Sequence, residues 1–161
     1  MPVEDFPALP RVEATVVEEL EAGQFFDAVH KVSRASSKDE KRPTLMGIYF
    51  EIKEGTLRLV STDSYRLAIK EIRGEFKVEE EGEFIVPASS LVNLARAAGK
   101  AGKINIMRDE NKGQLKFEAD GLNHFVRLIE GKFPKYEQFI PEETRTTLEV
   151  DRKEMIDAIK R

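Results

Sequence analysis

The sequence predicts an α+β fold in which a β-α-β-β-β unit occurs twice. Short runs of alternating hydrophobic residues are separated by turn signals that contain glycine or aspartate, and each half also holds one segment with helical spacing. The halves match along their length: Leu91 follows Phe26 by 65 positions in the helices, and Leu115 follows Leu57 by 58 positions in the strands. We therefore expect two helices packed on antiparallel sheets.

The first half begins after a proline-rich segment that is typical of an extended linker. A helix is expected next, because Phe25, Phe26 and Val29 recur on one side of a 3.6-residue period. Turn residues separate the strands that follow. The expected elements are a linker over 1–10, a strand over 12–18, a helix over 20–37, and strands over 46–52, 57–61 and 65–72.

The second half repeats that order with shorter elements. Pro87 is suited to the start of a helix, where its missing N–H is not needed, and Gly99 is suited to the end. The expected elements are a strand over 83–86, a helix over 91–98, and strands over 103–107, 115–118 and 125–129.

A third copy begins near the C-terminus. The segment 155–161 matches 25–31 at a shift of 130 positions, and Phe133-Pro134 resembles Phe6-Pro7 in the first linker. We expect one complete domain over 11–141, with 142–161 as the truncated start of a further domain of a longer protein.

Composition excludes several classes of protein. The chain has 161 residues, 40% of them hydrophobic, which suffices for the core of one domain. It has no run of about 18 apolar residues that could span a membrane, and no signal peptide at its N-terminus. With no cysteine and two histidines it has little material for a metal site. A net charge of −4 argues against coating of nucleic acid by bulk charge.

The polar sides of the two predicted helices are rich in cations. No acidic residue occurs between Pro87 and Lys103, although the chain contains 30. These sides form either a positive surface for phosphate groups or ordinary solvated faces, whose cations favour the C-terminal ends of the helices. The first helix carries Asp27, Lys31, Arg34 and Lys38 on this side, and the second carries Ser89, Asn93, Arg96 and Lys100.

The segment 62–68 has two interpretations. In the first it is a simple hairpin, in which Asp63 accepts hydrogen bonds from backbone amides and Leu67 enters the core. In the second, Tyr65 and Arg66 flank an apolar pocket, because both residue types are common anchors at protein interfaces. The pattern alone leaves both interpretations open.

Three motifs occur in order along the chain: RPTLMGI at 42–48, LRLVSTDSYRLA at 57–68 and GKFPKY at 131–136. With this spacing the chain resembles the bacterial DNA polymerase III beta subunit family, the replicative sliding clamps, over its whole length. The resemblance implies the DNA-clamp fold, with three similar domains in a complete chain, of which the middle one is present here. It also implies that two complete chains close head to tail into a homodimeric ring, whereas this chain alone is monomeric.

By this resemblance, duplex DNA passes through the ring and is bound weakly and without regard to sequence. A clamp performs no chemistry but tethers the polymerase, so we expect no catalytic residue, no cofactor and no metal. Helices line the hole, and the sheets with most carboxylates lie outside. The DNA-facing residues implied are Lys31, Arg34, Lys38, Arg96, Lys100 and Lys103.

The family also has a pocket between its middle and third domains. The DNA polymerase III alpha subunit, the clamp loader and other proteins with clamp-binding motifs insert a short peptide there. Gln138 departs from the pattern, because a basic residue can occupy its position, and the third domain would supply the other half of the pocket. The residues matched by position are Leu45, Thr62, Ser64, Tyr65, Arg66, Leu67, Pro134, Gln138 and Phe139.

Two other functions stay open at this stage. The first is a stand-alone protein-interaction module without a role on DNA. In that case charge reversal at Arg96 and Lys100 should leave every function of the intact protein unchanged. The second is a metal-dependent nuclease, which would need clustered carboxylates or histidines, whereas the acidic runs at 79–83 and 142–143 resemble solvated loops. The location expected for the sliding clamp is the cytoplasm, at the nucleoid.

Overall fold

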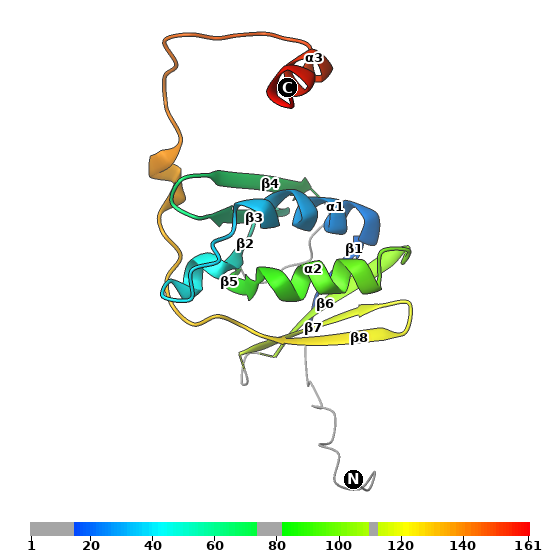
Figure 1. Cartoon of the computed structure of the whole chain (residues 1–161). Helices are drawn as coiled ribbons and strands as arrows, with labels where there is room; N and C mark the ends of the chain where they lie inside the picture. The colour runs from blue at the N-terminus through cyan, green and yellow to red at the C-terminus, as the bar shows by residue number, and fades with distance from the viewer. Residues whose placement is uncertain (1–14, 74–81, 110–112) are drawn as a thin grey trace, which may run out of the picture.

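The computed structural model describes residues 15–73, 82–109 and 113–161. Two four-stranded antiparallel sheets and two neighbouring helices make up the domain (Figure 1). The expected linker over 1–10 lies outside the described residues and remains a prediction.

The first half contains the predicted elements with shifted bounds. Helix α1 (Ala22–Val32) ends early because the hydroxyls of Ser33 and Ser36 bond to backbone carbonyls, and the short 3₁₀ helix η2 (Ser33–Ala35) follows it. Strand β4 (Leu67–Arg73) begins later than expected, because the amides before it are bound by Asp63. The other elements are β1 (Thr15–Glu21), the 3₁₀ helix η3 (Pro43–Met46), β2 (Gly47–Lys53) and β3 (Thr56–Thr62).

The second half also follows the predicted order. Strand β8 (Leu122–Arg127) starts earlier than expected, because Asp120 and Gly121 have positive φ angles of 44° and 78° and complete a tight turn directly after β7. The other elements are β5 (Gly82–Pro87), α2 (Ala88–Ala97), β6 (Lys103–Asp109), β7 (Gln114–Ala119), the 3₁₀ helix η4 (Tyr136–Phe139) and α3 (Arg152–Ile159).

The two halves exchange their first strands, which the internal repeat does not reveal. Strand β1 pairs with β6, so the first sheet has the order β1-β6-β7-β8. Strand β5 pairs with β2, so the second sheet has the order β4-β3-β2-β5. Each sheet therefore needs strands from both halves of the sequence.

Phe25 of α1 joins both sheets into one core. Its ring is fully buried, and its centroid lies 6.2 Å from that of Phe50 on β2 and 6.0 Å from that of Phe117 on β7. Both helices contribute buried residues to the same cluster, which covers the inner faces of the two sheets. The opposite sides of α1 and α2 are left exposed to solvent.

The C-terminal segment extends away from the sheets and ends in α3 (Figure 1). Asp151 caps this helix, because its carboxylate accepts hydrogen bonds from the amides of Lys153 and Glu154 at 2.8 and 3.0 Å. The helix expected from the match to 25–31 is therefore present, with no buried residue. Its assignment to a further domain remains a prediction.

Candidate nucleic-acid interface and partner pocket

The exposed sides of α1 and α2 lie next to each other and form one polar surface, called the helix face below. They are exposed because the apolar residues of both helices, such as Phe25 and Leu91, point into the core. The helix face consists of Asp27, His30, Lys31, Arg34, Asn93, Arg96 and Lys100.

Two cations of the helix face, Lys31 of α1 and Arg34 of η2, have partners four residues earlier on α1. The ammonium of Lys31 lies 2.7 Å from a carboxylate oxygen of Asp27, one turn earlier. Nη2 of Arg34 lies 2.9 Å from Nε2 of His30. The bond from Lys31 also lowers the pKa of Asp27, so this carboxylate stays charged near neutral pH.

The remaining cations of this side are available for an anion. Among the described residues, Arg96, Lys100 and Lys38 form no ion pair with a carboxylate, and all three are exposed. Lys38 follows η2 and so lies beyond the end of α1. Between the helices is a groove of about 380 Å³ lined mainly by small and apolar residues such as Val29, Val92 and Ala95.

Lys103 is not part of the helix face. It precedes Ile104, which is buried against the helices, so its own side chain leaves the other side of β6. There it forms an ion pair with Glu19 of β1. Six residues were matched to DNA contact. The structure places five of them on or beside the helices, and it places the sixth, Lys103, on the outer face of a sheet.

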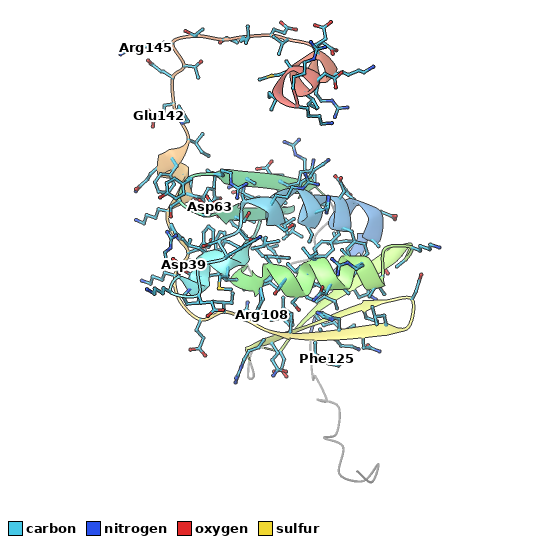
Figure 2. All side chains as sticks on the ribbon, viewed as in Figure 1. Asp39, Asp63, Arg108, Phe125, Glu142 and Arg145 are labelled. Carbon is cyan, nitrogen blue, oxygen red and sulfur yellow. The ribbon has the colours of Figure 1, made fainter. Side chains whose placement is uncertain are left out.

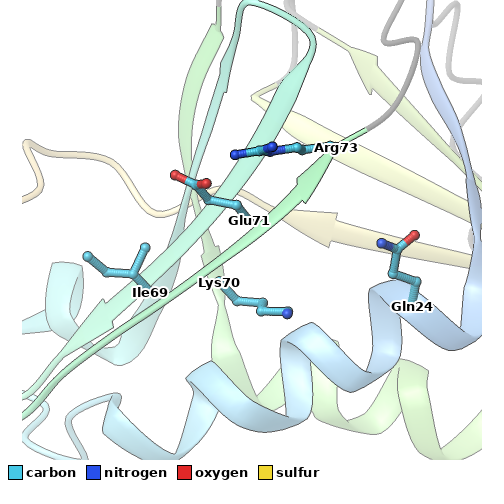
Figure 3. A pocket seen from close by; sticks show the side chains of 5 residues that line it. All are labelled: Gln24, Ile69, Lys70, Glu71 and Arg73. Atoms are coloured by element: carbon cyan, nitrogen blue, oxygen red, sulfur yellow. The ribbon is translucent and has the colours of Figure 1, made fainter.

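Lys70 is a cation that the sequence analysis missed. It lies on β4 between Ala68 and Ile72, which pack toward the helices, and it extends toward α1 beside a cavity of about 540 Å³ (Figure 3). Its positive charge contributes to the lowered pKa of Asp27. Side chains alternate between the two faces of a strand, so Lys70 shares the side of Ala68 and Ile72. The sequence alone did not show that β4 is an edge strand, and so this side could not be assigned.

Most carboxylates of the strands lie on the outer faces of the sheets, away from the helices. Arg58 of β3 binds Glu51 at 2.8 Å and Glu71 at 2.8 Å across neighbouring strands. Lys116 and Glu118 form a similar pair on β7. The carboxylates in these pairs are thus matched by cations of the same outer faces, whereas Arg96 and Lys100 on the helix side form no ion pair with a carboxylate among the described residues.

The turn between β3 and β4 is organised by Asp63. Its carboxylate accepts hydrogen bonds from the amides of Tyr65 and Arg66 at 2.9 and 2.8 Å, and from the guanidinium of Arg66 at 2.9 Å. These donors, above all the Arg66 amide, hold the pKa of Asp63 at about 2. Ser64 takes a positive φ of 78°, and Tyr65 is left 92% exposed.

This turn is tied to the segment before η3. Arg42 donates to Oδ2 of Asp39 at 3.0 Å and to Oγ of Ser64 at 3.1 Å. Figure 2 shows Asp39 and Asp63 at the end of the domain where these two segments lie. Leu45 of η3 and Thr62 at the end of β3 are buried, whereas Leu67 is half-buried.

The segment after β8 crosses the outer face of the second sheet. The ring of Phe133 stacks on Tyr49 of β2 at 5.0 Å between centroids, and the hydroxyl of buried Tyr136 accepts from Arg58 at 3.0 Å and donates to Glu51 at 3.2 Å. These contacts fix the approach to η4. The segment carries half-buried Pro134 and exposed Gln138 and Phe139.

The nine residues matched to the peptide pocket therefore come from three segments, η3, the β3–β4 turn, and the chain around η4. The structure shows how each segment is anchored. Arg42, Arg58 and Tyr136 lie within the three sequence motifs, but their role as anchors appears only in the structure. Their partners are 22 and 78 positions away, so no local pattern could have revealed them.

The described part of the chain shows neither a metal-binding cluster nor a membrane-spanning helix. Within the described ranges, no three His, Asp or Glu side chains are grouped so that they could hold a metal ion. In the same part of the chain no helix combines the length and apolar character needed to cross a membrane.

Comparison with known proteins gives a consistent result. The family model of the DNA polymerase III beta subunit, central domain, matches residues 19–135. The beta sliding clamps of Micrococcus luteus and Streptomyces coelicolor are each 31% identical to this chain over all of it, and the matches cover 52% and 44% of those proteins. The chain thus spans about half the length of these curated relatives.

Solved structures of sliding clamps have the same fold as this chain. A DNA polymerase sliding clamp from Bacillus subtilis is similar with a TM-score of 0.92 at 25% identity, over 99% of this chain and 42% of that one. A sliding clamp from Pseudomonas aeruginosa bound to griselimycin gives a TM-score of 0.81 at 25% identity, over 90% and 39% of the two chains.

Proposed function

The chain belongs to the DNA polymerase III beta subunit family, and we propose that it forms the central domain of a sliding clamp. In this proposal two longer chains close into a ring around duplex DNA, and the ring tethers the replicative polymerase. The polymerase then stays at high effective concentration near its template, so that one dissociation does not end synthesis. The clamp is not an enzyme, needs no cofactor, and works in the cytoplasm at the nucleoid.

The unequal charge of the two sides is the observation that carries this proposal. Arg96, Lys100 and Arg34 project from the helix face, whereas carboxylates such as Glu51 and Glu118 lie on the outer faces of the sheets. Duplex DNA carries one negative charge per about 1.7 Å of its length, so the helix face, where cations outnumber the one carboxylate of its described residues, suits the inside of a ring. An acidic protein can in this way present a cationic surface to DNA.

The proposed partners bind at the pocket formed by η3, the β3–β4 turn and the chain around η4. Its three segments carry the exposed rings of Tyr65 and Phe139 and the guanidinium of Arg66, which suit a short peptide with apolar and acidic residues. A relative that binds griselimycin supports the presence of a ligand site in the family. The polymerase alpha subunit and the clamp loader are the partners proposed, and the third domain would complete the pocket.

The test uses the full-length protein that contains this domain, loaded by its clamp loader onto a nicked circular DNA. The circle is then cut once, and retention of protein is compared before and after cutting at moderate salt. A sliding clamp stays on the circle and leaves the linear product, because its link is topological. Equal retention on both forms would mean ordinary affinity and would contradict the proposal, and so would loss from both forms.

A further inference from the structure

Asp27 is an unexpected residue on a surface proposed to bind DNA. Within the described residues it is the one carboxylate of the helix face, where the other charged residues are cations. Its position in the middle of α1 excludes a role at the helix N-terminus, where a carboxylate would favour the helix dipole. A carboxylate at this place repels phosphate unless it is neutralised.

Asp27 is neutralised by a cation of the same surface. Its Oδ2 lies 2.7 Å from Nζ of Lys31, and both side chains remain more than half exposed. Lys70 approaches from β4 on the same side of the sheet (Figure 3), and its charge acts on Asp27 as well. Lys31 is therefore paired with Asp27 before any DNA arrives. To bind Lys31, a phosphate oxygen must either displace the Asp27 carboxylate or share the ammonium group with it.

We propose that Asp27 sets the strength of DNA binding by holding Lys31 in an internal ion pair, so that the helix face binds duplex DNA more weakly than its cations would allow. This inference rests on the proposed function, because it assumes that the helix face is the DNA side. An exposed ion pair of this kind is weak and opens easily. Lys31 then exchanges between Asp27 and successive phosphates, which suits a protein that must move along DNA.

The experiment measures binding of this 161-residue chain to a short duplex of mixed sequence by NMR titration at several salt concentrations. Asp27→Asn keeps the shape of the side chain but releases Lys31. We expect it to raise the affinity roughly three- to tenfold near 0.1 M salt and to steepen the dependence of log K on log salt by about 0.9, because one further counterion is displaced.

A double-mutant cycle tests the mechanism. Lys31→Gln alone should weaken binding, because it leaves the Asp27 carboxylate without its partner, whereas Asp27→Asn combined with Lys31→Gln should return affinity and salt dependence close to those of the wild type. Glu19→Gln is the matched control. It makes the same change in net charge and releases Lys103, but on the outer face of a sheet, so it should leave binding unchanged.

A separate variant keeps this inference distinct from the proposed function. If Arg96→Gln with Lys100→Gln weakens binding but Asp27→Asn does not strengthen it, the DNA side is correct and the role of Asp27 is wrong. Equal effects of Asp27→Asn and Glu19→Gln would show a simple effect of net charge and would also overturn the inference. If the duplex shifts no helix resonance of the wild type or of any variant, the inference about Asp27 fails, whereas the proposed function is decided separately by retention of the full-length protein on circular DNA.

Discussion

Single polar residues set the local geometry and the acid stability of this domain. Asp63 binds two amides and one guanidinium, and these donors keep its pKa near 2, so the turn that carries Tyr65 stays intact over the neutral range. The half-buried pair between Ser90 of α2 and His124 of β8 behaves differently. Burial lowers the pKa of His124, so the folded protein favours the neutral ring.

His124 should therefore make the protein less stable in mild acid. The unfolded chain takes up a proton near the ordinary pKa of 6.5, whereas the folded chain resists it, so the free energy of unfolding falls as the pH drops below 6.5. We expect His124→Gln to remove part of this decline between pH 6.5 and about 5, as measured by urea unfolding at several pH values. His30→Gln, on the exposed helix face, is the control, and an equal effect of both variants would contradict the role of burial.

At the level of elements, the chain around η4 depends on contacts that lie outside it. Phe133 stacks on Tyr49, and Tyr136 joins Arg58 and Glu51 on the second sheet. The hydrogen bond that Arg58 donates to the hydroxyl of Tyr136, together with the pair to Glu71, raises the pKa of Arg58, so this guanidinium stays charged at all relevant pH values. Proposed pocket residues such as Phe139 owe their position to these anchors.

Tyr136→Phe should loosen this segment without disturbing the core. The change removes a buried hydroxyl that accepts one hydrogen bond and donates another, which corresponds to a loss of about 1 kcal/mol in the free energy of unfolding. We expect faster hydrogen exchange at the amide of Ile140, which bonds to Glu137 within the same turn, and weaker binding of a clamp-binding peptide. Tyr65→Phe, at a 92% exposed position, should leave this exchange unchanged. Equal exchange in both variants would mean that the hydroxyl of Tyr136 is not an anchor.

The whole molecule is held together by strand exchange and by one shared core. Because β1 belongs to the sheet of the second half and β5 to that of the first, neither half can complete its sheet alone. Phe25 contacts a ring from each sheet and so couples the two. The domain should therefore unfold as one cooperative unit.

Phe25→Ala should destabilise both sheets together, by about 3–5 kcal/mol in the free energy of unfolding, because it leaves a cavity between them. Hydrogen exchange should rise at Ile48 in the second sheet and at Ile106 in the first to a similar extent. Phe139→Ala, at a 63% exposed position, should change stability by less than about 0.5 kcal/mol. Faster exchange in only one sheet would show that the sheets are not coupled through Phe25.

The sequence by itself determined the α+β class, the order of the elements and the basic sides of the helices. These features depend on hydrophobic periods of two or 3.6 residues and on turn chemistry, which act over a few neighbouring positions. It also carried the family motifs at 42–48, 57–68 and 131–136, which the match to the DNA polymerase III beta subunit family supports.

Only the tertiary structure decided which strands pair, which cations share a face and which residues anchor the segments of the proposed pocket. It paired β1 with β6, separated Lys103 from the helix face, and brought Lys70 toward Asp27. Each of these results depends on contacts between residues far apart in the chain. Such contacts form because all the elements bury their apolar residues in one common core. A pattern that extends over a few neighbouring positions does not specify which distant elements meet there.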